Sequence, residues 1–142
     1  MKLTELLGVL DVKQIQGDTA QEISGIAYDS RRTYPGNIFV AVRGLVHNGA
    51  SFIPEAFQHG VRVVVTDTDM EIPAGITKVT VPAARAALAI LANYFYGFPS
   101  RKFKLVGITG TKGKTTVSYL IEAIFKHAGF KTGVIGTVES RI

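Results

Sequence analysis

The stretch Gly107–Thr116 carries glycines, lysines and threonines at a spacing that suits phosphate chemistry. The apolar run Phe103–Ile108 leads into it and predicts a short buried strand, and apolar residues recur at helical spacing over Val117–Ala128. The glycines let the backbone curl so that successive N–H groups converge on an anion. The first N–H groups of a helix have no intrahelical acceptor, so they point at whatever lies before the helix. A strand, a glycine-rich turn and Lys-Thr at a helix start together predict a nucleotide-phosphate loop.

Two side chains of this loop have predicted roles. Lys114 adds a point charge on the β- and γ-phosphates and is the candidate catalytic residue, and the Thr115 hydroxyl is the candidate Mg²⁺ ligand. The strict motif places glycine at position 108, where this chain has isoleucine. The alternative is a strand–helix turn that binds nothing, which the fit of both flanks disfavours. The predicted ATP-binding residues are Gly110, Thr111, Lys112, Gly113, Lys114, Thr115 and Thr116.

Composition sets the class of protein. The chain has 142 residues, of which 46% are hydrophobic and 19% charged, as expected of one ordinary packed domain. It has no cysteine, which excludes disulfides, cysteine metal sites and a thiol nucleophile. The N-terminus lacks the apolar region of a signal peptide, and no apolar stretch reaches membrane-spanning length. We therefore expect a cytoplasmic protein without a membrane partner.

The charge is unevenly distributed along the chain. Residues 1–98 hold eight Lys/Arg and nine Asp/Glu, which gives −1, and residues 99–142 hold eight and two, which gives +6. The excess positive charge thus accompanies the phosphate loop. Nucleic acid is the usual alternative partner of a basic patch, but aromatic residues are not interleaved with these charges. A nucleoside triphosphate accounts for the charge, and we expect no nucleic-acid partner.

Strands and helices alternate along the first 97 residues, which predicts an α/β fold. Pro35-Gly36 marks a turn, Gly60 a helix end, and Pro82 the first turn of a long helix. The expected strands are Ile23–Tyr28, Ile38–Val42, Val61–Thr66 and Thr77–Val81, and the expected helices are Leu3–Leu10, Phe52–His59 and Ala83–Tyr96.

A boundary is predicted at Gly97-Phe98-Pro99-Ser100, where turn residues end the long helix. We predict a domain over 1–97, a linker over 98–102, and over 103–142 the first β–loop–α–β of an ATPase domain. Gly129 should end the helix of that piece, and Thr132–Thr137 should form its next strand. Parallel sheets are normally buried on both faces, which one or two strands cannot achieve. We therefore expect the chain to be an N-terminal fragment of a longer enzyme.

Two stretches resemble the Mur ligase family. The run Tyr28–Gly44, with Asn48-Gly49 and Phe52-Ile53 after it, resembles the uridine-nucleotide-binding N-terminal domain of these enzymes. Phe95–Ser100, followed by Ile108–Thr116, resembles the junction into their central ATPase domain. The family loop reads Gly-Thr-x-Gly-Lys-[Ser/Thr], which accounts for the absence of glycine at position 108. The resemblance covers essentially the whole chain, and is strongest to the members that add the third residue of the peptidoglycan stem peptide.

The resemblance implies an ATP- and Mg²⁺-dependent amide ligation. ATP phosphorylates a substrate carboxylate to an acyl phosphate, and the amine of an amino acid attacks it with release of phosphate. The substrates would be UDP-N-acetylmuramoyl-L-alanyl-D-glutamate and diaminopimelate or lysine. By the family pattern, Ser30 contacts the uridine diphosphate end, and Tyr28, Leu45, Val46 and His47 line that pocket.

Several of these assignments have alternatives. Ser30 can instead belong to an Asp-Ser turn that bonds its own backbone. Arg31 and Arg32 can pair with the diphosphate, and at least one of them is expected to be an ordinary surface residue. Asn48 stands where the family often has aspartate, and Lys112 where it often has asparagine.

Other function classes are also compatible with a phosphate loop. One is another Mur ligase, including the MurF type. A second is a P-loop switch or motor NTPase, which would have no use for the pattern over Asp29–Gly44. A third is a nucleotide- or nucleic-acid-binding module without ligase activity, for which the +6 charge of residues 99–142 speaks.

Overall fold

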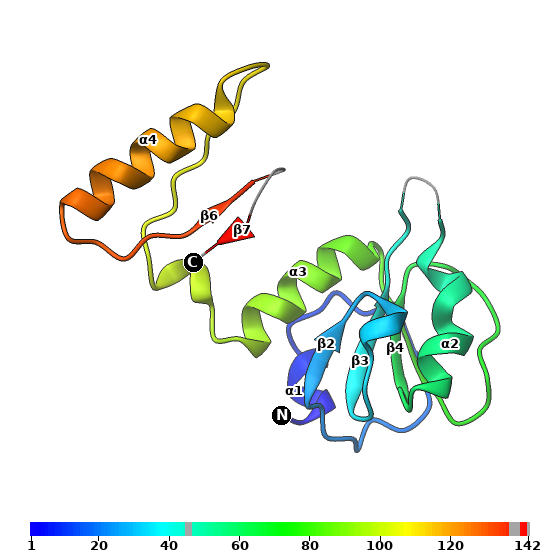
Figure 1. Ribbon diagram of the computed structural model, residues 1–142. Coiled ribbons are helices and arrows are strands. Elements are labelled where there is room, and N and C mark those ends of the chain that lie inside the picture. Colours follow the sequence, from blue (N-terminus) through cyan, green and yellow to red (C-terminus); the bar gives the residue numbers. More distant parts are fainter. Residues whose placement is uncertain (45–46, 137–139, 142) are drawn as a thin grey trace. The chain divides into compact units, whose positions relative to one another are not determined.

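The computed structural model describes residues 1–44, 47–136 and 140–141. The chain divides into two compact units, Met1–Phe103 and Lys104–Ile142 (Figure 1). Each unit has its own sheet among the described residues, five strands in the first and two in the second.

The first unit is built on a mostly parallel sheet with strand order β1-β5-β4-β3-β2. The four predicted strands are confirmed, and they run parallel to one another. They are β2 (Gly25–Ala27), β3 (Asn37–Ala41), β4 (Val63–Thr66) and β5 (Thr77–Thr80). The fifth strand, β1 (Gln14–Gln16), is an antiparallel edge strand beside β5 and was not predicted. All three of its residues are exposed, so it lacks the apolar pattern of a core strand.

Helices cover both faces of this sheet (Figure 1). Side chains alternate along a strand, so Ile38 and Val40 of β3 enter one core, whereas Phe39 and Ala41 enter the other. The first core includes residues of α1 (Leu3–Leu7) and α3 (Ala84–Phe95), and the second includes residues of α2 (Ile53–Gln58). Burial on both faces explains why β3 and β4 appear in the sequence as uninterrupted apolar runs.

Glycine ends α2 and α3 as predicted. Gly60 has φ +91° and its N–H donates to Phe57 C=O at 3.0 Å, while Val61 N–H donates to Ala56 C=O at 3.1 Å. Gly97, with φ +69°, repeats this arrangement after α3. Both are Schellman motifs, in which a left-handed glycine lets the last carbonyls of the helix find donors.

The predicted role of Pro82 at the first turn of α3 is wrong. The helix begins at Ala84, so Pro82 precedes even the N-cap residue Ala83. The Asp67 carboxylate, which follows β4, accepts the Ala84 N–H at 3.0 Å and caps the helix from a distant part of the sequence. A side-chain cap from another strand end leaves no local signal.

The second unit consists of α4 (Lys114–His127) and a short antiparallel pair, β6 (Val134–Ile135) and β7 (Ser140–Arg141). The helix and its end at Gly129 are confirmed, with Phe130 N–H bonded to Phe125 C=O at 3.0 Å. Of the strand predicted over Thr132–Thr137, only Val134 and Ile135 are strand among the described residues, and Thr132, Gly133 and Gly136 are not; Thr137 lies outside the described residues.

The predicted buried strand Phe103–Ile108 is wrong. These residues form no strand, and the Leu105 side chain is 78% exposed. A strand needs a neighbour to bond its backbone, and no described strand pairs with this run. The apolar side chains of α4 also lack a partner. Val117, Leu120 and Ile124 are exposed, because no sheet face lies against them within this unit.

A buried carboxylate ties α4 to β7. Glu122 is 7% exposed and pairs with Lys126 at 2.8 Å and with Arg141. The ammonium of Lys126 and the guanidinium of Arg141 lower the pKa of Glu122. The Arg141 guanidinium also lies 4.7 Å from the centre of the Tyr119 ring.

No helix within the described ranges is long and apolar enough to span a membrane.

Gly49→Ala tests the tightest backbone approach in the first unit. A Cβ at this position would lie 2.4 Å from Val42 O and 2.7 Å from Val42 N, so the two segments would have to separate. We expect a loss of about 1–3 kcal/mol in the free energy of unfolding, measured by urea denaturation. Gly8→Ala is the matched control, because its Cβ would have no neighbour closer than 3.4 Å. Equal stability of the two variants would contradict this prediction.

Candidate functional site

The first candidate site lies at the carboxyl edge of the parallel sheet. The turn Asp29–Arg32 follows β2, the segment from Arg43 follows β3, and Asp67 follows β4. Parallel strands bring their carboxyl ends to one edge, where ligands of open α/β sheets usually bind. Arg43 and Asn48 form an isolated antiparallel bridge, and Gly44 N–H donates to His47 C=O at 2.8 Å. Leu45 and Val46 lie outside the described residues.

Asp29 organises the turn after β2. Its Oδ1 accepts the backbone N–H of Arg31 at 3.1 Å, and its two carboxylate oxygens accept the Arg31 guanidinium at 2.9 and 2.8 Å. This hydrogen-bonded guanidinium lowers the pKa of Asp29 to about 2. Arg31 is therefore paired within the turn. Arg32 is exposed, and its side chain has no ion pair in the part of the chain that the structure describes.

Ser30 is buried at the centre of this turn. Its hydroxyl donates to the Glu55 carboxylate of α2, and its carbonyl accepts from Thr33 Oγ1 at 2.7 Å and from His59 Nδ1 at 2.9 Å. The sequence allowed Ser30 either to contact the nucleotide or to belong to an Asp-Ser turn. The turn is present, and the side chain that closes it is that of Asp29, not that of Ser30. The Ser30 hydroxyl bonds α2, and Glu55 and His59 were missed because they follow 25 and 29 residues later.

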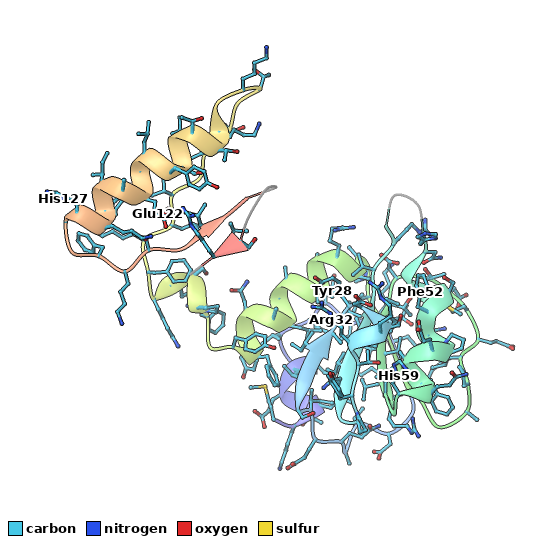
Figure 2. All side chains as sticks on the ribbon, in the orientation of Figure 1. Tyr28, Arg32, Phe52, His59, Glu122 and His127 are labelled. Carbon is cyan, nitrogen blue, oxygen red and sulfur yellow. The ribbon has the colours of Figure 1, made fainter. Side chains whose placement is uncertain are left out.

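Aromatic side chains lie near the same edge (Figure 2). Tyr28 is 69% exposed, and the exposed His47 ring meets Phe52 edge to face with 6.1 Å between centroids. Phe52 was not among the predicted pocket residues. Asn48 accepts the Ala50 N–H at 3.1 Å and caps the 3₁₀ helix Gly49–Phe52. Aspartate could make the same bond, so asparagine at this position preserves the local conformation.

The second candidate site is the loop before α4. Gly113 is the N-cap with φ +78°, and Gly110 has φ +153°, both in the region that favours glycine. The first backbone bond of the helix joins Val117 N–H to Gly113 C=O at 2.9 Å. The N–H groups of Lys114, Thr115 and Thr116 therefore lie at the open end of the helix, where an anion is favoured.

The Lys114 ammonium folds back over this loop. Its Nζ donates to Gly110 C=O at 2.6 Å, which places the charge beside the glycines and the open helix end. Lys112 and the other loop residues from Thr109 to Thr116 are exposed, so the loop is accessible from solvent. The donor set suits the phosphates of a nucleotide.

The fit to Mg²⁺ is partial. Thr115 stands in the first turn of α4 and offers a hydroxyl oxygen, a ligand type that Mg²⁺ accepts. The described residues contain no group of three or more His, Cys, Asp or Glu side chains placed to hold a metal. Thr115 can therefore supply one ligand, and the rest would come from the phosphates, water or other residues.

Comparison with known families gives two matches in chain order. Residues 22–96 match the Mur ligase family, catalytic domain, and residues 108–142 match the Mur ligase middle domain. The first match alone covers more than half of the 142 residues and includes the edge described above. The second match begins at the glycine-rich loop.

Curated relatives share one name. The UDP-N-acetylmuramoyl-L-alanyl-D-glutamate–2,6-diaminopimelate ligase of Syntrophomonas wolfei is 42% identical over 142 residues, covering 100% of this chain and 29% of that protein. The enzyme of the same name from Phocaeicola vulgatus is 43% identical over 139 residues, covering 97% of this chain and 29% of its own length. The chain thus spans under a third of these relatives.

Solved structures share the fold. A structure named as the same diaminopimelate ligase matches with a TM-score of 0.75 at 23% identity, covering 99% of this chain and 28% of that one. A MurF structure from Acinetobacter baumannii matches with a TM-score of 0.69 at 24% identity, covering 89% and 27%. MurF from Thermotoga maritima in complex with ADP matches with a TM-score of 0.53 at 25% identity, covering 79% and 25%.

Arg31→Ala tests the pairing inside the turn. Removal of the guanidinium should raise the pKa of Asp29 from about 2 towards its ordinary 3.8, followed by carboxyl-carbon NMR titration. Since the folded-state pKa is depressed, the stabilisation is present above pH 3.8 and is lost as the pH falls towards 2. Arg32→Ala is the control and should move this pKa far less. A larger effect of Arg32→Ala would show that the pairing is wrongly assigned.

Proposed function

Because this chain belongs to the Mur ligase family, we propose that it is part of an ATP-dependent ligase of peptidoglycan synthesis. The enzyme adds the third amino acid, diaminopimelate or lysine, to UDP-N-acetylmuramoyl-L-alanyl-D-glutamate, as MurE does. The observation that carries this proposal is the 42% identity, across the whole chain, to a ligase named for that substrate.

We assign a different ligand to each of the two candidate sites. At the sheet edge, Tyr28, Ser30 and the loop through His47 hold the uridine end of the substrate. The N–H groups of Gly110–Thr116 and the Lys114 ammonium hold the ATP phosphates, with Mg²⁺ on the Thr115 hydroxyl. Negative charge spreads over the transferring phosphoryl group, so converging donors that need no reorganisation lower the barrier.

MurF-type ligation is the alternative within the family. Solved MurF structures share the fold at 24–25% identity, whereas the relatives at 39–43% identity are named diaminopimelate ligases. The MurE-type reaction is therefore better supported. A P-loop module without ligase activity would not explain the candidate site at the sheet edge, which is formed by the turn Asp29–Arg32 and the segment Arg43–Asn48. We expect the cytoplasm as its location, with small-molecule substrates and neither nucleic acid nor membrane as partner.

Calorimetric titration of UDP-N-acetylmuramoyl-L-alanyl-D-glutamate tests the first half of the proposal. We expect the 142-residue chain to bind this ligand, and UDP alone, in a saturable one-to-one manner. We expect no amide formation by the chain alone, because reacting atoms must be held about 3–3.5 Å apart by the rest of the enzyme. CDP is the matched control for recognition of the base. Absence of binding in this chain and in the full-length enzyme would refute the MurE-type assignment.

Lys114→Ala tests the second half. In the full-length ligase, loss of the ammonium should abolish ATP turnover. The reason is that the positive charge of Lys114 stabilises the negative charge that builds up on the transferring phosphoryl group. Lys126→Ala, a change on the same helix beyond the phosphate loop, serves as the control and should retain turnover. Unchanged ATP affinity and turnover in Lys114→Ala would remove the phosphate-loop interpretation.

A further inference from the structure

Residues of α2 and its C-cap form hydrogen bonds with the hydroxyl and the carbonyl group of Ser30. Glu55, in the first turn of α2, accepts the hydrogen bond of the Ser30 hydroxyl. His59 caps the other end of α2, and its Nδ1 lies 2.9 Å from the Ser30 carbonyl oxygen. A carbonyl oxygen only accepts, so the His59 ring donates from Nδ1. One short helix thus fixes the side chain and the backbone of a residue in a separate turn.

Two hydrogen bonds close this turn without the Ser30 hydroxyl. The turn is already closed by the Asp29 carboxylate on the Arg31 N–H at 3.1 Å and by Thr33 Oγ1 on the Ser30 carbonyl at 2.7 Å. A residue that only had to pack at 6% exposure could be alanine. Here a hydroxyl is buried against a carboxylate instead, which orients it more firmly than packing would.

We propose that Glu55 is a positioning residue for the uridine nucleotide, acting through Ser30. This inference rests on the proposed function, in which Ser30 contacts the uridine diphosphate end. A free serine hydroxyl rotates among three staggered positions. A charge-assisted bond to the carboxylate selects one of them and commits the single hydroxyl proton. The Ser30 oxygen then presents its remaining lone pairs in one fixed direction, as a pre-oriented acceptor for a donor of the uridine, the uracil N–H or a ribose hydroxyl, and not for the diphosphate, which has only acceptors.

Positioning predicts a specific coupling between the two residues. If Glu55 acts only through Ser30, its removal should have no effect on nucleotide affinity once the Ser30 hydroxyl is gone. If Glu55 merely supports the fold, its removal should lower the melting temperature and weaken binding equally in both backgrounds. A double-mutant cycle separates these two cases.

The experiment measures the Kd of UDP by calorimetry for the 142-residue chain. The variants are Ser30→Ala, Glu55→Ala, Glu55→Gln and the double change Ser30→Ala with Glu55→Ala. We expect Ser30→Ala and Glu55→Ala each to raise the Kd about tenfold, and the double variant to bind no more weakly than Ser30→Ala. Glu55→Gln should retain part of the affinity, because its amide oxygen can accept the same bond. Glu71→Ala, a change of an exposed glutamate, should bind as the unaltered chain does.

Two results would overturn the proposal: a Kd for Glu55→Ala equal to that of the unaltered chain, or losses that add fully in the double variant. Melting temperatures are recorded for every variant. If Glu55→Ala does not fold, the cycle is completed with Glu55→Gln, and full additivity there has the same meaning. Absence of UDP binding by the unaltered chain would instead overturn the proposed function, and this inference with it.

Discussion

The burial of a parallel sheet on both faces is the constraint on which the first unit depends. Parallel strands need crossover connections, and these place helices on the sheet faces. In this chain α1 and α3 cover one face and α2 the other, and β3 and β4 contribute alternate side chains to two separate cores. The second unit shows the reverse case. Its helix α4 has exposed apolar residues, and the apolar run before its loop forms no strand.

The same constraint creates the site at the sheet edge. Because β2, β3 and β4 run parallel, the polar segments that follow these strands begin at the same edge of the sheet. This edge lies outside the two hydrophobic cores. α2 then links the core to the site, since Ile53 and Ala56 are buried while Glu55 and His59 bond Ser30. The loop before α4 needs less support, because the start of α4 and two glycines with positive φ form its geometry locally.

The sequence predicted what local patterns determine, and missed what distant partners determine. Apolar runs located β3 and β4, and glycines located the ends of α2, α3 and α4. Asp67 as the cap of α3, and Glu55 and His59 on Ser30, are contacts between residues 17 to 29 positions apart, for which one sequence gives no signal. The strand over Phe103–Ile108 was predicted from apolar character alone, but a strand also needs a partner to bond. The resemblance to a family supplied the predicted pocket residues, and it gave no indication of the bonds from Glu55 and His59 to Ser30.

We propose that the carboxyl edge of the first unit binds the uridine nucleotide, while the loop before α4 binds the adenine nucleotide. Amide chemical-shift mapping of the isotope-labelled chain, titrated with UDP and then in a fresh sample with ADP and Mg²⁺, tests it most directly. We expect UDP to shift the amide signals of Tyr28–Arg32 and of the segment from His47 to Phe52, and ADP to shift those of Gly110–Thr116. Shifts from UDP confined to Gly110–Thr116, or the same residues shifted by both nucleotides, would contradict it.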